Sequence, residues 1–183
     1  TKTILSQCNK CTDNINFTYG ELPVELYEYN KYLIQDDYDK ALKISKKIPF
    51  ENFRECIHDG IAIGEEAFSS VLRATFKGTI EDNSENRGLV QRYLYSAILM
   101  ATAAEKAYIA LKPDRIVMIH GIYLTHGIST KVANKLGIPV VVVGGGGIRK
   151  DTAILCHGET YHQQLINEPN TLWEDTVLNP VQS

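Results

Sequence analysis

The fold class is indicated most clearly by the segment that begins Lys112-Pro-Asp-Arg-Ile-Val-Met-Ile-His-Gly121. Its near-continuous apolar run over Arg115–His120 is typical of a strand buried on both faces of a parallel sheet. A helical apolar stripe that ends at Leu136 follows, and a second buried strand is predicted over Pro139–Val143. Strand, helix and strand form a βαβ unit, which is almost always right-handed. The pattern therefore predicts an α/β fold.

The remaining elements were assigned from apolar periodicity and from turn residues. The pattern predicts strands over Thr3–Cys8 and Thr152–His157, a loop over Asn9–Gly20, and helices within 26–47, over Ile63–Phe76 and over Asp82–Leu111. Together these elements predict a Rossmann-like, mostly parallel sheet with helices on both faces. We expect residues 1–183 to form a single domain. The absence of an initiator Met and the polar last dozen residues suggest a piece of a longer chain.

Composition narrows the function classes. The chain has 183 residues, of which 44% are hydrophobic, and a formal net charge of −3. These values favour a globular domain and argue against non-specific binding to nucleic acid or to an anionic membrane. The longest apolar run, Ile138–Val143, is far shorter than the roughly 20 residues that span a bilayer. The N-terminus carries no secretory signal pattern. We therefore expect a cytoplasmic protein without a transmembrane segment.

Four glycines, Gly144–Gly147, follow the second predicted strand, and Arg149 and Lys150 come directly after them. A dinucleotide fingerprint or a P-loop would require further residues in register and a helix that begins at the loop, and neither pattern is complete. Two interpretations stay open. The loop either presents bare backbone to a ligand, with the two cations binding a phosphate or carboxylate, or it is a flexible hinge.

Three histidines lie at or near predicted strand ends. His120 and His157 each end a strand immediately before a glycine, and His126 starts the helix that follows the first of them. If all three predicted strands are parallel, their carboxyl ends converge on one edge of the sheet. A histidine at such an edge can deprotonate a hydroxyl group, because its pKa lies near neutral pH. The alternative is a buried structural histidine with a satisfied hydrogen bond.

Other catalytic and metal-binding patterns are weak. Cys8 and Cys11 have CxxC spacing, but a thioredoxin-type pair needs a helix that starts at the first cysteine. Structural zinc would need two more ligands, and Cys56 with His58 is the only compact candidate. The Gly-x-Ser-x-Gly motif of serine hydrolases is absent. We therefore expect free thiols, no bound metal and no cofactor.

Several segments, read in order, resemble bacterial glycosyltransferases of capsule or surface-polysaccharide biosynthesis. They are Gly64–Ile80, Lys112–Gly121, Leu136–Val140, Cys156–Thr160 and the early Cys8–Cys11 segment. The resemblance covers nearly the whole chain, although its motifs are loose. It implies the N-terminal, acceptor-side half of a GT-B enzyme, in which two Rossmann-like domains face each other across a cleft. The nucleotide-sugar donor would bind to a missing C-terminal domain, in the cytoplasm at the inner membrane.

The resemblance also implies site residues. His120 and His126 are the candidate catalytic bases. The candidate residues for binding a carbohydrate acceptor are Gly121, Tyr123, Gly144, Gly145, Gly146, Gly147, Arg149, Lys150, His157 and Tyr161. The chain departs from the family pattern at His120-Gly121, where Asn-Gly is common, and it lacks the acidic residue with Arg that the family often carries near the start of the loop formed here by Gly144–Gly147. Two other functions stay open: a non-catalytic Rossmann-like module that binds a carbohydrate or metabolite, and a small nucleotide-binding enzyme that uses the glycine loop.

Overall fold

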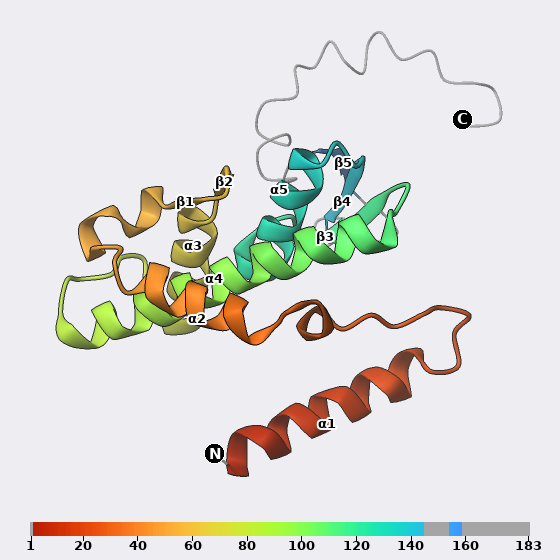
Figure 1. Ribbon diagram of the computed structural model, residues 1–183, viewed down its shortest axis with the longest axis horizontal. Helices are drawn as coiled ribbons and strands as arrows, with labels where there is room; N and C mark the ends of the chain where they lie inside the picture. The colour runs from red at the N-terminus through yellow and green to blue at the C-terminus, as the bar shows by residue number, and fades with distance from the viewer. Residues whose placement is uncertain (1, 145–153, 159–183) are drawn as a thin grey trace, which may run out of the picture.

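The computed structural model describes residues 2–144 and 154–158 (Figure 1). Helices dominate this part of the chain. In order, the elements are α1 (Lys2–Tyr19), a 3-10 helix (Tyr29–Tyr32), α2 (Gln35–Ser45), a 3-10 helix (Phe50–Glu55), β1 (Ile57–His58), β2 (Ile61–Ala62), α3 (Gly64–Thr75), α4 (Ser84–Leu111), β3 (Ile116–Ile119), a π-helix (Tyr123–Gly127), α5 (Ile128–Lys135), β4 (Val140–Gly144) and β5 (Ile154–His157).

The expected Rossmann-like sheet is not formed, and this prediction was wrong. The described strands make an antiparallel pair, β1–β2, and a three-stranded sheet in the order β3–β4–β5. Strand β3 is parallel to β4, whereas β5 runs antiparallel to β4. Among the described residues, helices cover one face of this sheet, since Ile116 and Val142 are buried while Val117 and Ile119 on the other face are 66% and 56% exposed. A mostly parallel sheet with two helical layers, and with it half of a GT-B architecture, is therefore excluded for the described residues.

The N-terminal segment was also predicted incorrectly. Thr3–Cys8 lies within α1, which continues through most of the segment expected to be a loop. Short apolar runs such as Ile4-Leu5 fit the period of a strand and of a helix equally well, so periodicity alone does not separate the two. Figure 1 shows α1 lying apart from the other elements. Its exposed Phe17 contributes nothing to the core.

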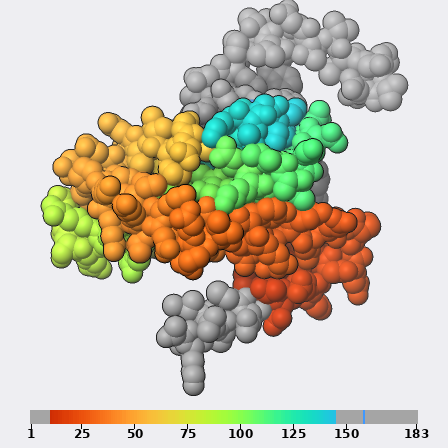
Figure 2. Space-filling model, in the orientation of Figure 1, coloured from red at the N-terminus to blue at the C-terminus, as the bar shows by residue number. Residues whose placement is uncertain are grey.

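The core is built around α4. Its predicted start is confirmed within two residues and its end at Leu111 is confirmed, but Leu111 itself, expected in the buried stripe, is 38% exposed. The Asn83 side chain caps the helix by accepting a hydrogen bond from the backbone N–H of Asn86 at 2.9 Å. The stripe then repeats with helical period, and its fully buried members include Val90, Leu94, Ala97, Ala101 and Ala104. The small alanines allow α2, α3 and α5 to pack closely against α4. Figure 2 shows the orange segment that contains α2 lying against the green of α4.

Helix α4 is also the one described helix that has the length and apolar composition of a membrane span. Its most apolar 18-residue window has a mean hydropathy of 1.2, and 44% of that window is buried inside the protein. Helices α2, α3 and α5 all pack against α4, which has a buried stripe of its own. Core helices of globular proteins share these properties.

Candidate functional site

A pocket of about 1140 Å³ opens where β3 ends. Three parts of the chain form its walls: the second half of α3, one face of α4, and the segment that runs from the end of β3 into the π-helix. The lining residues are Ser70, Arg73, Ala74, Phe76, Leu89, Arg92, Tyr93, Ser96, Ile119, His120, Tyr123, Leu124, Thr125 and His126.

The backbone that follows β3 is strained. His120, Gly121 and Tyr123 all have left-handed φ angles, of 64°, 65° and 67°. This conformation is uncommon for a non-glycine residue and costs on the order of 1–3 kcal/mol, most clearly for a bulky side chain such as Tyr123. The π-helix begins at Tyr123 and closes with a hydrogen bond from the Gly127 N–H to the Ile122 carbonyl at 3.2 Å. Strained backbone and π-helices both concentrate at functional sites.

Helix α3 holds this strained segment in place. Buried Ser70 donates its hydroxyl to the Glu66 carbonyl and accepts the backbone N–H of Leu124, each at 2.8 Å. The Glu66 carboxylate is buried and pairs with the Lys131 ammonium at 2.8 Å, which links α3 to α5. A methyl group at Gly127 would overlap the Glu66 carboxylate, so glycine allows the close approach. The backbone between His120 and α5 is therefore held by contacts with α3.

Positive and neutral groups surround the pocket. The Arg73 guanidinium lies over the Tyr123 ring, 4.7 Å from its centroid. Arg92 enters from α4. Burial lowers the pKa of His126, and the positive charge of nearby His120 lowers it further. No Asp or Glu is among the described residues that line the pocket. His126 can thus serve as a neutral base in a positively charged site.

The lowered pKa of His126 predicts a pH-dependent stability. The unfolded chain binds a proton at this histidine near pH 6.5, whereas the folded chain binds it only at lower pH. This contribution to the free energy of unfolding is complete above about pH 6.5, and it is lost as pH falls through the folded pKa. Urea denaturation of wild type and His126→Gln at pH 7.5 and pH 5.5 measures it. The variant should lose less stability on acidification, and equal losses would contradict the assignment.

The structure brings three predicted site residues together. His120, Tyr123 and His126 line the same pocket, and Gly121 lies in the turn between them. Gly144 ends the adjacent strand, where the Val143 carbonyl accepts the His120 N–H at 3.2 Å. The carboxyl ends of β3 and β4 therefore meet at one edge, as the sequence predicted.

His157 does not join this group. Because β5 is antiparallel, His157 pairs with Val141, and the Gly158 N–H bonds to the Val140 carbonyl at 2.9 Å. His157 thus lies near the amino end of β4, opposite the edge that carries His120. The three strands are not all parallel, so their carboxyl ends do not converge on one edge of the sheet. Gly145, Gly146, Gly147, Arg149, Lys150 and Tyr161 lie outside the described residues.

Sequence reasoning missed the helical half of the pocket. Ser70 and Arg73 share one face of α3 at i, i+3 spacing, and Arg92 and Ser96 share one face of α4 at i, i+4 spacing. The available signal was a polar stripe beside the buried stripe of α4. That stripe could equally have been a solvated surface.

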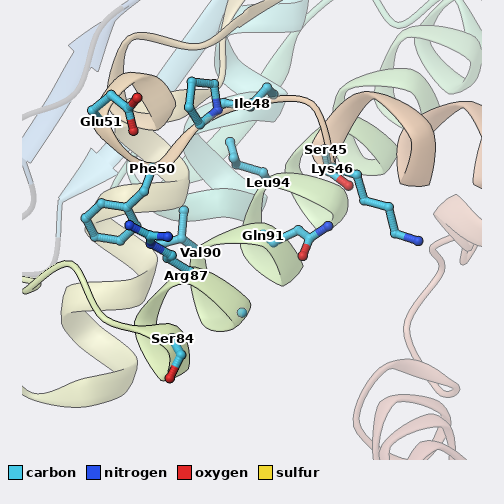
Figure 3. A pocket seen from close by; sticks show the side chains of 12 residues that line it. Ser45, Lys46, Ile48, Phe50, Glu51, Ser84, Arg87, Val90, Gln91 and Leu94 are labelled. Atoms are coloured by element: carbon cyan, nitrogen blue, oxygen red, sulfur yellow. The ribbon is translucent and has the colours of Figure 1, made fainter.

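A second hollow, of about 700 Å³, lies between the end of α2 and the first turns of α4. Figure 3 shows its side chains, which come from the end of α2, the Pro49–Glu51 segment and the first turns of α4. No histidine is among its described lining residues, and the charge of its Arg87 is neutralised by Asp82, with Nη2 and Oδ2 2.8 Å apart. This hollow therefore offers less chemistry than the first.

The two cysteines whose side chains the structure describes, Cys11 and Cys56, do not lie on the same element. Cys11 is exposed on α1, and partial burial raises the pKa of the Cys56 thiol. Among the residues whose side chains the structure describes, 10–144, no group of three His, Cys, Asp or Glu side chains is placed to hold a metal ion. The Cys8 side chain is not among them, so the zinc alternative stays a prediction.

No family model, curated protein or solved structure matches the chain.

Proposed function

We propose that this pocket binds the carbohydrate acceptor of a glycosyltransferase that builds a surface polysaccharide. The observation that supports this most directly is the presence of His126, with its lowered pKa, beside His120 and Tyr123 in an open pocket. The loose sequence resemblance to capsule glycosyltransferases points the same way. The proposal needs neither a Rossmann-like sheet nor a nucleotide fingerprint in this chain.

The lining suits a sugar. Tyr93, Tyr123 and exposed Phe76 provide aromatic faces that can cover the C–H face of a sugar ring. Hydroxyl groups of Ser96 and Thr125 can exchange hydrogen bonds with sugar hydroxyls. An apolar wall with a few convergent polar groups is the usual composition of a small-molecule site.

In the proposed reaction, His126 accepts the proton of an acceptor hydroxyl as its oxygen bonds to the anomeric carbon of the donor sugar. The bond from that carbon to the donor phosphate breaks, and the phosphate leaves with the electron pair. A neutral imidazole is required for this step, and the lowered pKa of His126 keeps it neutral at physiological pH. The nucleotide-sugar would be held by a further domain, on the cytoplasmic side of the inner membrane.

A second candidate is a module that binds a carbohydrate or metabolite without chemistry. It is favoured by the lack of a carboxylate among the described lining residues, because a carboxylate commonly orients a catalytic histidine. Both candidates require the same pocket to bind a sugar.

Sugar binding can be tested by titrating the ¹⁵N-labelled protein with neutral mono- and disaccharides and recording amide spectra. We expect shifts for Gly121–Gly127 and for the pocket face of α4, and none for Lys46 in the second hollow. Tyr123→Ala should weaken binding by about tenfold, since it removes a packed aromatic face. The matched change Tyr27→Ala, at an exposed tyrosine outside the pocket, should have no effect. Shifts confined to other surfaces would overturn the proposal.

A further inference from the structure

The pocket is lined by two arginines that come from different helices. Arg73 comes from the last turn of α3 and Arg92 from the first third of α4, so two separate helices deliver them to one cavity. Stacking on Tyr123 orients the Arg73 guanidinium beside the histidine turn. The pair is therefore held by the fold and does not result from neighbouring positions in the sequence.

Two other arginines of the chain are neutralised by carboxylates. Arg54 binds Glu65 through two nitrogens, with Nη2 and Oε1 3.1 Å apart, and Arg87 binds Asp82 in the same two-pronged way. In contrast, neither Arg73 nor Arg92 forms an ion pair with any carboxylate of the described residues. Their five N–H donors each match the planar geometry of a carboxylate or phosphate.

The electrostatics of the pocket reinforce this difference. With two guanidinium groups and no carboxylate among the described lining residues, the pocket carries an excess of positive charge although the whole chain has a net charge of −3. Such a local excess of one sign in a hollow concentrates ligands of the opposite sign.

We propose that Arg73 and Arg92 form a subsite for an anionic group, a phosphate or carboxylate, carried by the sugar that occupies the pocket. This inference rests on the proposed acceptor site and names its substrate class: a phosphorylated sugar or a uronic acid. The apolar and aromatic wall of Phe76, Leu89 and Tyr123 contacts the sugar ring, while the two guanidinium groups bind its anionic group. The imidazoles then face the hydroxyls of the same ring.

The test compares glucose, glucose 6-phosphate, glucuronate and inorganic phosphate by isothermal titration with the full chain. At least one anionic sugar should bind tenfold or more tightly than glucose, and raising the salt concentration should reduce this advantage. Arg73→Met and Arg92→Met, which retain an unbranched apolar stem, should each lower the affinity for the anionic sugar about tenfold. Both should leave the affinity for glucose within twofold. Arg87→Met, in the second hollow, is the matched control and should change neither.

The outcomes separate this subsite from the acceptor function. If glucose and the anionic sugars bind with equal affinity, or if Arg87→Met lowers affinity as much as the pocket variants do, the proposed anion subsite is contradicted. Sugar binding by the pocket is still supported in that case. If inorganic phosphate binds through Arg73 and Arg92 but no sugar binds more tightly than phosphate, the result supports the anion subsite and contradicts the acceptor function. Preference between glucose 6-phosphate and glucuronate identifies which anion the site recognises.

Discussion

Replacement of His126 with Gln is expected to lower the turnover of glycosyl transfer by about 10²- to 10⁴-fold. Glutamine retains a polar side chain of similar size, but it cannot accept the hydroxyl proton. Because the imidazole acts on a bound acceptor, the KM for the acceptor should change by much less than kcat. The measurement is steady-state transfer from a nucleotide-sugar donor, with the polypeptide that carries both donor and acceptor sites.

The shape of the pH profile gives an independent check. A base with a lowered pKa gives a rate that rises with pH, with the midpoint of the rise below pH 6.5 in wild type. This rise of the rate with pH should be absent in His126→Gln. His58→Gln, which changes a histidine on β1 outside the pocket, is the control. It should leave both kcat and its pH dependence unchanged. If the turnover of His126→Gln is within threefold of wild type, His126 is not the catalytic base, and the non-catalytic binding module becomes the supported function.

The largest expected effect on folding comes from Gly64→Ala. Gly64 is the buried first residue of α3, and its N–H donates to the Cys56 carbonyl at 3.0 Å. A methyl group there would overlap the backbone carbonyl oxygens of Phe53 and Arg54. Backbone atoms cannot rotate aside as a side chain can, so we expect the free energy of unfolding to fall by about 3 kcal/mol.

Gly88→Ala is the matched control for that change. Gly88 is exposed in the interior of α4, and no atom would lie within 4 Å of an added methyl group. The higher helix propensity of alanine should raise the free energy of unfolding by about 1 kcal/mol. Urea denaturation followed by circular dichroism measures both variants. Stabilisation of both variants would show that helix propensity, not the close contact at Gly64, governs both positions.

The sequence predicted the elements whose apolar periodicity runs over several turns or whose ends carry clear stop signals. Helices α3, α4 and α5 and strands β3 and β4 belong to this group. The long stripe from Val90 to Tyr108 allows only one period, and Gly137-Ile-Pro139 separates α5 from β4.

The failures have a common physical cause. A short run such as Ile154-Leu-Cys156 has the same apolar pattern in either direction, so the sequence could not reveal that β5 is antiparallel. The expected parallel sheet depended on that direction, which tertiary contacts decide. At Thr3–Cys8 the apolar run is too short to separate a strand from a helix.

The candidate site was predicted in part for the same reason. His120, Tyr123 and His126 follow a strand directly, and strand ends are where ligand sites are expected in α/β proteins. Arg73 and Arg92 reach the pocket only because α3 and α4 pack with a particular pair of faces together. Local sequence does not specify that pairing.

The left-handed Tyr123 has an implication for protein engineering. Folding alone would favour glycine or asparagine at this position, since either adopts a φ of 67° with less strain than a tyrosine. A library screened for heat resistance would therefore enrich Tyr123→Gly and similar changes, because relief of local strain raises stability. Such variants would lack the tyrosine ring on which the Arg73 guanidinium stacks. Selection for robustness without selection for ligand binding would remove the site from this protein.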